Sequence, residues 1–211
     1  MTPLHVCLIA YLLGSIPFGV ILTRIAGLGD LRQIGSGNIG ATNVLRTGRR
    51  ALAATTLLLD ALKGTVAVLL AKVFTPTADI AQLAAMLALL GHMYPVWLRF
   101  KGGKGVATAL GIWLALSPLV FFAMAVTWLV AAVTSRISSV GALAGMLALP
   151  IAAWIIAPAY LPCAFLTMAL VVLRHHENIS RLIKGTEPKI GKKKKEESND
   201  AELKGDATAG Q

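Results

Sequence analysis

Long apolar runs separated by short polar stretches make up most of the chain up to residue 173. Several of these runs approach the roughly 20 residues that an α-helix needs to cross a bilayer. The runs cover residues 4–23, 51–73, 78–98, 106–133 and 137–156, and a last run ends at residue 173. This pattern predicts an all-α, polytopic membrane protein and excludes a water-soluble globular domain.

The run over residues 106–133 is long for one span, and Ser117 and Pro118 interrupt it. We therefore divide it into two helices, which gives seven transmembrane helices, whereas a single tilted helix would give six. With the amino terminus outside, seven helices leave only Lys72 on the outer side, and six would also move Arg136 and the basic carboxyl-terminal stretch there. Cytoplasmic loops are enriched in Lys and Arg. We therefore expect seven transmembrane helices, with the N-terminus outside and the C-terminus cytoplasmic.

Composition and charge refine this picture mainly at the carboxyl terminus. The chain of 211 residues is 56% hydrophobic and has a formal net charge of +10. Its basic residues are spread over the loops and form no basic domain with interleaved aromatic residues, which excludes a nucleic-acid partner. We expect one membrane domain over residues 1–188 and a disordered cytoplasmic tail over residues 189–211, first basic and then acidic. The lysines of the tail either touch anionic lipid or are simply solvated.

Three polar stretches follow predicted spans on the cytoplasmic side: residues 35–46, 99–105 and 174–188, which we call motifs 1, 2 and 3. Motif 1 combines glycines and side-chain amides with Arg46. Glycines let a ligand approach the backbone, so that N–H groups can bind an anion, and a guanidinium offers a planar fork for a phosphate. The alternative interpretation of motif 1 is a glycine-rich connector. Because all three motifs emerge on one face, we expect them to line one pocket.

Positive charge and glycine-rich backbone at a membrane interface suit a phosphorylated ligand, and no metal ion is needed to neutralise the ligand. An acyl chain yields about 0.8 kcal/mol per buried methylene, so a fatty substrate would partition to the same interface. The candidate residues are Ser36, Asn38, Thr42, Asn43, Arg46, Lys101, Lys104, Arg174, His175, Asn178, Arg181 and Glu187.

Several familiar motifs are matched only superficially. Gly35, Gly37 and Gly40 satisfy the dinucleotide-binding spacing, but a membrane helix stands where that fingerprint needs a β-strand. The pair Gly103–Lys104 lacks the Ser or Thr and the upstream glycine of a Walker loop. The four histidines are not spaced with carboxylates or cysteines as a zinc site requires, and none begins an H-x4-D acyltransferase signature. We therefore expect no metal and no cofactor.

Two pairs of residues inside the predicted spans also stand out. Asp60 and Lys63 are three residues apart and can pair on one helix face, either as a structural clasp or with a direct ligand role. Gly141 and Gly145 form a small-residue face that allows close helix packing. The two cysteines lie in apolar runs, where buried free thiols are expected and a disulfide is the alternative.

Three longer segments resemble the motifs of the bacterial membrane-integral acyl-phosphate:glycerol-3-phosphate acyltransferase family. They are Gly35-Ser-Gly-Asn-Ile-Gly-Ala-Thr-Asn-Val-Leu-Arg46, Gly91-His-Met-Tyr-Pro95 with Phe100-Lys-Gly-Gly-Lys-Gly-Val-Ala-Thr108, and Leu173-Arg-His175 through Glu187. The resemblance covers nearly the whole chain except the lysine-rich tail. It implies that the 1-hydroxyl of glycerol 3-phosphate attacks the carbonyl of a fatty acyl phosphate. The products would be 1-acylglycerol 3-phosphate and phosphate, in the first step of phospholipid synthesis.

The resemblance suggests roles for five catalytic candidates. Arg46 and Lys104 bind phosphate, Ser36 donates a hydrogen bond, and His175 and Asn178 orient or deprotonate the hydroxyl. The base is either His175 or a phosphate of the substrate, and Ser36 could instead form an acyl-enzyme. An acyl phosphate is already activated, so the protein must chiefly position two anions and stabilise the oxyanion.

The other candidates are assigned to substrate binding. N–H groups of Gly102 and Gly103 reach the acyl phosphate, and Glu187 fixes either Arg181 or the glycerol end. The full substrate-binding set is Gly37, Asn38, Thr42, Asn43, Lys101, Gly102, Gly103, Arg181 and Glu187. The expected partners are glycerol 3-phosphate, fatty acyl phosphate and membrane lipid. We expect a monomer in the bacterial inner membrane, with its active site facing the cytoplasm.

Two other classes of protein compete with the enzyme. A transporter of organic phosphates would need polar groups and broken helices near the bilayer midplane. Apart from Asp60 and Lys63, the polar residues of this chain lie at one face. A membrane scaffold that recruits partners through the lysine-rich tail would leave the glycine-rich motifs unexplained. Synthesis of lysophosphatidate distinguishes the enzyme from both alternatives.

Overall fold

The computed structural model describes residues 1–190, and all regular structure in this part of the chain is helical, which confirms the all-α prediction. The helices are α1 (Pro3–Gly14), α2 (Phe18–Ile25), α3 (Ala41–Leu45), α4 (Arg50–Phe74), α5 (Ala78–Met93), α6 (Val106–Leu116), α7 (Pro118–Ser135), α8 (Ser138–Ile156), α9 (Leu161–Arg174) and α10 (His176–Ile183). Three short 3₁₀ helices are η1 (Leu31–Gln33), η2 (Val96–Leu98) and η3 (Pro158–Tyr160). The tail predicted over residues 189–211 lies, apart from its first two residues, outside the described part.

Prolines mark two breaks between helices. Pro118 is the first residue of α7, so the run over residues 106–133 forms two helices, as predicted. The run over residues 4–23 consists of α1 and α2, which are bent by 43° around Pro17 and together are long and apolar enough to form the single span expected. Proline has no N–H and clashes with the preceding turn, so it starts a helix more readily than it continues one.

Three helical stretches are long and apolar enough to cross a membrane: Ala78–Leu98, α7 and α8. The number rises to five when the bent pairs α1–α2 and α9–α10 are each taken as one span. α4 has 25 residues but carries Asp60 and Lys63 in its middle, and α6 has only 11 residues. The chain is therefore a multi-pass helical membrane protein, and the number of seven crossings stays a prediction.

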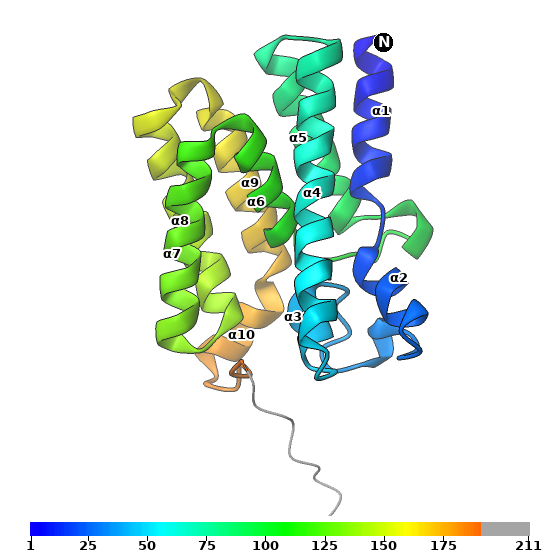
Figure 1. Ribbon diagram of the computed structural model, residues 1–211. Coiled ribbons are helices and arrows are strands. Elements are labelled where there is room, and N and C mark those ends of the chain that lie inside the picture. The colour runs from blue at the N-terminus through cyan, green and yellow to red at the C-terminus, as the bar shows by residue number, and fades with distance from the viewer. Residues whose placement is uncertain (191–211) are drawn as a thin grey trace, which may run out of the picture.

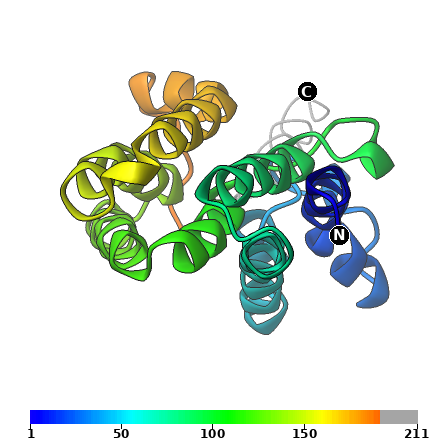
Figure 2. The ribbon, with the colours of Figure 1, turned by 90° about the horizontal axis from the view of Figure 1, so that it is seen from above.

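α6 joins two groups of helices. It packs against α4, which lies beside α1 and α5, and it also contacts α7, which packs along α8. α9 lies against α8 and reaches α5. Seen from above, α1, α4 and α5 occupy one side of the molecule and α7, α8 and α9 the other (Figure 2). The short helices α2, α3 and α10 lie at the end remote from the amino terminus (Figure 1).

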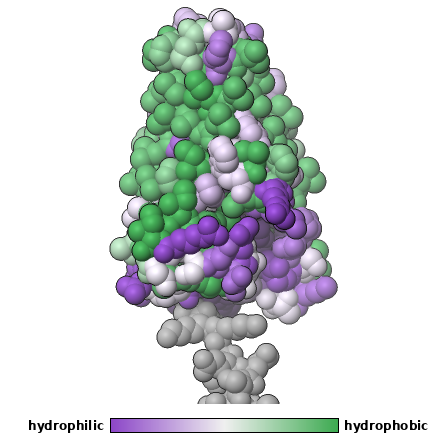
Figure 3. All heavy atoms as spheres, turned by 90° about the vertical axis from the view of Figure 1, so that its right-hand side faces the viewer, coloured by the Kyte–Doolittle hydropathy of each residue, from purple (hydrophilic) through white to green (hydrophobic). Residues whose placement is uncertain are grey.

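The surface is divided along the same axis. Figure 3 shows hydrophobic residues over most of the helical body and hydrophilic residues gathered mainly toward the end where α2, α3 and α10 lie. Such a division suits a protein whose body contacts lipid and whose one end contacts water. The polar end is where all three motifs approach one another.

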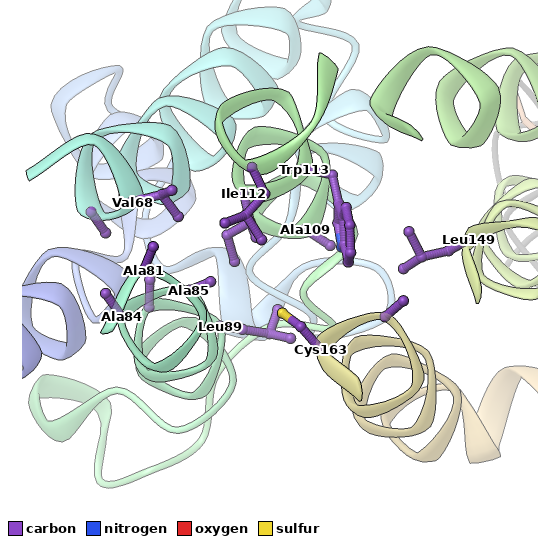
Figure 4. Close-up of a cluster of buried hydrophobic side chains, with 14 of the residues drawn as sticks. Val68, Ala81, Ala84, Ala85, Leu89, Ala109, Ile112, Trp113, Leu149 and Cys163 are labelled. Carbon is purple, nitrogen blue, oxygen red and sulfur yellow. The ribbon is translucent and has the colours of Figure 1, made fainter. Parts of the chain in front are cut away.

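The core is built largely from small side chains. Three alanines of α5 are buried where this helix packs against its neighbours: Ala81, Ala84 and Ala85. They lie near Val68 of α4 and Ile112 of α6 (Figure 4). Trp113, Leu149 and Cys163 extend this core into the second group of helices. Both cysteines, Cys7 and Cys163, are free, and Cys163 is buried, in agreement with the expected thiols.

Glycines allow the closest helix crossings. A methyl group at Gly111 of α6 would lie 1.8 Å from the carbonyl oxygen of Ala61 in α4, so only glycine fits there. Gly141 and Gly145 of α8 face Trp128 and Met124 of α7, which confirms the predicted small-residue packing face. Lipid tails are as apolar as leucine, so membrane helices depend on such close contacts for their association.

Candidate active site

Asn43 organises motif 1 from its centre. Its side-chain oxygen accepts hydrogen bonds from the backbone N–H of Ser36 (3.0 Å) and from Ser36 Oγ (3.3 Å). Its amide nitrogen donates to the carbonyl oxygens of Leu31 (3.2 Å), Ile34 (2.8 Å) and Asn38 (2.8 Å). Asn43 is 2% exposed, so its polar atoms shape the loop rather than face the solvent.

The turns of motif 1 require glycine. Gly35 and Gly37 have φ of 59° and 70°, in the left-handed region that other residues rarely adopt. A methyl group at Gly35 would also lie 2.5 Å from Asn43 Oδ1. The resulting loop leaves Ser36 and Arg46 exposed, and it buries Asn38 Oδ1 without a hydrogen-bond partner among residues 1–190.

Motif 2 is held by backbone pairing, and this corrects one predicted role. The N–H groups of Gly102 and Gly103 donate to the carbonyl oxygens of Met93 (3.1 Å) and His92 (3.0 Å). They are therefore not free to reach an acyl phosphate, contrary to the prediction. The missing side chains serve close approach instead, because a methyl group at Gly103 would lie 2.1 Å from His92 Nε2.

Arg174 of motif 3 clamps motif 2 from the other side. Its guanidinium donates to the carbonyl oxygens of Gly103 (3.2 Å) and Gly102 (3.1 Å) and stacks over the Tyr94 ring, 5.4 Å from the ring centre. The sequence placed Arg174 in the pocket but assigned it no role. This clamp leaves Lys104, the next residue along motif 2, directed at Asn178.

A hydrogen-bonded chain joins motifs 2 and 3. Lys104 Nζ donates to Asn178 Oδ1, and Asn178 Nδ2 donates to Glu187 Oε1 over 2.5 Å. Glu187 also accepts from Ser139 Oγ (2.7 Å) at the start of α8 and pairs with Arg181 Nε through Oε2 (2.7 Å). Of the two roles open for Glu187, the structure supports the fixing of Arg181. The partner of Lys104, Asn178, is therefore itself held in place by Glu187.

Burial and hydrogen bonding shift the ionisation of this chain. Burial raises the pKa of Glu187, but the hydrogen bonds from Asn178, Ser139 and Arg181 outweigh it and hold that pKa below its usual value. Burial lowers the pKa of Lys104, and the nearby charge of Arg181 lowers it further. Glu187 therefore stays ionised at neutral pH. Among the described residues, the ammonium group of Lys104 forms no ion pair with a carboxylate.

Two residues of motif 1 lie near the hydrogen-bonded series Lys104–Asn178–Glu187. Thr42 Oγ1 and Ser138 Oγ are 3.0 Å apart, which ties motif 1 to the start of α8, next to Ser139. Burial lowers the pKa of the Arg46 guanidinium. The negative charge of Glu187 raises this pKa, and the positive charge of Arg181 lowers it. Arg46 therefore lies within electrostatic range of motif 3, as the predicted pocket requires.

His175 is held at the junction of α9 and α10. Its Nδ1 lies 2.7 Å from the carbonyl oxygen of Val171, and the side chain is 4% exposed. A carbonyl oxygen can only accept, so Nδ1 carries the hydrogen and Nε2 of the neutral ring presents a lone pair. This is the tautomer that a general base needs.

The structure thus brings most of the predicted residues to one end of the molecule. Lys101 is exposed and is held by no side chain of residues 1–190, so it lies at the rim. Sequence analysis missed Ser138 and Ser139, which connect α8 to motifs 1 and 3. In the sequence they could have been recognised as two adjacent serines at the start of an apolar run, on its predicted cytoplasmic side.

Comparison with known proteins places the chain in a family. The family model described as glycerol-3-phosphate acyltransferase matches residues 4–185. A glycerol-3-phosphate acyltransferase of Agrobacterium fabrum is 56% identical over 189 residues, covering 88% of this chain and 91% of the relative. That of Cereibacter sphaeroides is 57% identical over 188 residues, covering 88% of each.

Solved structures agree with this result. A crystal structure of PlsY (YgiH), an integral membrane glycerol 3-phosphate acyltransferase, in its glycerol 3-phosphate form has a TM-score of 0.85 and 38% identity and covers 90% of this chain and 96% of that one. The lysophosphatidic acid form of PlsY gives a TM-score of 0.83 and 37% identity, over 90% and 95% of the two chains. The chain therefore belongs to the glycerol-3-phosphate acyltransferase family.

Proposed function

We propose that the protein transfers a fatty acyl group from an acyl phosphate to the 1-hydroxyl of glycerol 3-phosphate. The observation that carries this proposal is the hydrogen-bonded series Lys104–Asn178–Glu187 at one polar end, with Arg46 and His175 within electrostatic range of it. A solved relative that was crystallised with glycerol 3-phosphate and with lysophosphatidic acid supports the acceptor and the product. The products would be 1-acylglycerol 3-phosphate and inorganic phosphate.

The reaction needs no nucleophile from the protein. The hydroxyl oxygen attacks the acyl carbon, the bond from that carbon to the phosphate oxygen breaks, and phosphate leaves with the bonding electrons. The hydroxyl proton passes to His175 Nε2 or to a phosphate oxygen of a substrate. Arg46 and Lys104 offset the charge of two anions that would otherwise repel each other, and Ser36 donates a hydrogen bond.

The substrate-binding residues act in two ways in this proposal. Lys104 exchanges its bond to Asn178 for a phosphate oxygen, and Arg181, which uses only its Nε–H for Glu187, borders the same space. Asn43, Gly102 and Gly103 shape the loops instead of touching the substrate. The remaining wall residues are Gly37, Asn38, Thr42 and Lys101.

The proposal includes seven crossings with the active site at the cytoplasmic face of a bacterial inner membrane. Five spans follow from length and composition when the bent pairs are counted. α4 and α6, which pack against each other, supply the other two. This arrangement is supported by the positive-inside distribution of the loops.

One assay separates the enzyme from its alternatives. Purified protein in detergent micelles is mixed with palmitoyl phosphate and glycerol 3-phosphate, without coenzyme A, acyl carrier protein or added metal. We expect lysophosphatidate and phosphate in equal amounts, and a loss of more than about 100-fold in Lys104→Ala. Failure to form lysophosphatidate, together with uptake of glycerol 3-phosphate into proteoliposomes, would overturn the proposal in favour of a transporter.

A further inference from the structure

A buried polar cluster lies under the active site and takes no part in the proposed chemistry. It consists of Asp60 and Lys63 of α4 and His92 of α5, all at most 4% exposed. Lys63 Nζ lies 2.8 Å from Asp60 Oδ1, and His92 Nδ1 lies 3.7 Å from the same oxygen. The predicted Asp60–Lys63 pair is thus confirmed, with His92 as an additional member. Buried charges in membrane helices are costly, so their presence calls for a role beyond packing.

One arm of the cluster reaches motif 1. Lys63 Nζ donates to the carbonyl oxygen of Ile16 over 2.8 Å, in the break between α1 and α2. The next helix, α2, then packs directly on motif 1, because a methyl group at Gly19 would lie only 2.0 Å from the carbonyl oxygen of Ile39. Val20 of α2 joins Ile39 in a small apolar cluster. Lys63 therefore fixes the bend that sets the position of motif 1.

The other arm reaches motif 2. The carbonyl oxygen of His92 accepts the N–H of Gly103, and the His92 ring lies against the Gly103 backbone so closely that no side chain fits between them. Gly103 directly precedes Lys104. The His92 ring therefore faces Asp60 through Nδ1 and lies against the backbone of Gly103, the residue before Lys104, on its Nε2 side.

We propose that Asp60, Lys63 and His92 form a positioning centre that fixes motif 1 relative to motif 2. Asp60 is its hub, because one carboxylate oxygen faces both Lys63 and His92. The two motifs carry Arg46 and Lys104, so their separation decides whether the two anionic substrates meet in reactive geometry. This proposal rests on the proposed function, but the displacement of the motifs can be measured without it.

The first test removes both buried charges together. A single substitution would leave a lone buried charge and destabilise the fold, whereas Asp60→Leu combined with Lys63→Met replaces the pair by apolar side chains of similar size. Lys72→Met is the matched control, because Lys72 lies on the same helix and also donates to a backbone carbonyl, that of Ala115, at the other end of the molecule.

Hydrogen exchange read by mass spectrometry gives a readout independent of activity. In the double variant we expect amide exchange in residues 99–105 to accelerate at least ten-fold, while exchange in α7 and α8 stays unchanged. We also expect kcat to fall at least ten-fold with KM for glycerol 3-phosphate within about three-fold, because each motif still binds its own substrate. The Lys72→Met control should match the parent protein in both measurements.

A second pair of variants keeps the proposal testable if the double variant fails to fold. His92→Asn retains a donor near the position of Nδ1, and His92→Leu does not. We expect His92→Asn to preserve the exchange protection of residues 99–105 and kcat, and His92→Leu to lose both. Equal exchange and equal kcat in these two variants, or an unchanged kcat in a folded double variant, would overturn the proposal. If the parent protein itself makes no lysophosphatidate, the exchange results still decide the positioning role.

Discussion

His175 is held through one ring nitrogen, and the proposed reaction uses the other. Nδ1 is fixed by the Val171 carbonyl, and the buried ring has little freedom to turn. As a general base, the neutral imidazole must be present, so the rate should fall as the pH drops and the ring becomes protonated.

We therefore expect His175→Ala to lower kcat by about 10²- to 10⁴-fold and to abolish the acidic limb of the pH–rate profile. The measurement is kcat over pH 5 to 9 with saturating substrates. The neighbouring His176 is exposed and serves as the control residue, because His176→Ala should keep the parent profile. A profile unchanged in His175→Ala would assign the proton transfer to a substrate phosphate.

Ser36 lies in surroundings that do not activate a nucleophile. Its hydroxyl faces Asn43 Oδ1 at 3.3 Å, and an amide oxygen is not a general base. We expect Ser36→Ala to retain measurable turnover and the parent protein to release no burst of phosphate without acceptor. Rapid-mixing measurement of phosphate tests this, and a trapped acyl adduct on Ser36 would contradict it.

Glu187 connects α10 and α8, so its ionisation acts on two elements at once. Its pKa is held below the ordinary 4.5, because the three hydrogen bonds to its carboxylate are strongest while it is ionised. A depressed pKa in the folded state contributes stability that is complete above about pH 4.5 and is lost as the pH falls through the folded-state pKa.

We therefore expect Glu187→Gln to lower Tm by a few degrees at pH 7, consistent with a loss of about 2 kcal/mol from charge-assisted hydrogen bonds. The difference from the parent protein should shrink as the pH falls below about 4.5. Thermal unfolding in micelles over pH 3.5 to 7.5 measures it. An offset that stays constant over this range would show that the carboxylate charge does not matter.

The crossing of α4 and α6 depends on a missing side chain. A methyl group at Gly111 would overlap the backbone of α4, whereas the nearest atom to a methyl group at Gly145 is 3.1 Å away. We expect Gly111→Ala to destabilise the protein by about 1–3 kcal/mol and Gly145→Ala by clearly less. Thermal stability in the same detergent gives the order, and equal effects would contradict the crossing.

The sequence predicted the elements better than their mutual contacts. The break at Pro118 and the packing face of Gly141 follow from local rules, because proline and glycine act on their own backbone. The pairing of Gly103 with His92 was not predictable from spacing, since it depends on how the chain turns back over α5. For the same reason the amides of motif 2 were expected to be free and are not.

At the scale of the whole molecule, the predicted orientation can be checked by labelling. In a background without Cys7 and Cys163, a cysteine introduced at Pro76 should react with an impermeant maleimide in intact cells. Cysteines at Arg136 or Lys101 should react only after the membrane is permeabilised. Labelling of the Lys101 position from outside would place motif 2 on the wrong face and contradict the proposed cytoplasmic active site.

The brevity of α6 has a consequence for how the two reactants arrive. Its 11 residues extend about 16 Å, roughly half of a 30 Å hydrocarbon layer. In the proposed seven-span arrangement, a helix this short places Lys104, two residues before its start, below the level of the lipid headgroups. In the proposed reaction, the acyl phosphate would reach Lys104 from the lipid with its acyl chain still in the membrane, whereas glycerol 3-phosphate would enter from the aqueous side. The proposed product, 1-acylglycerol 3-phosphate, would then leave into the adjacent leaflet without passing through water.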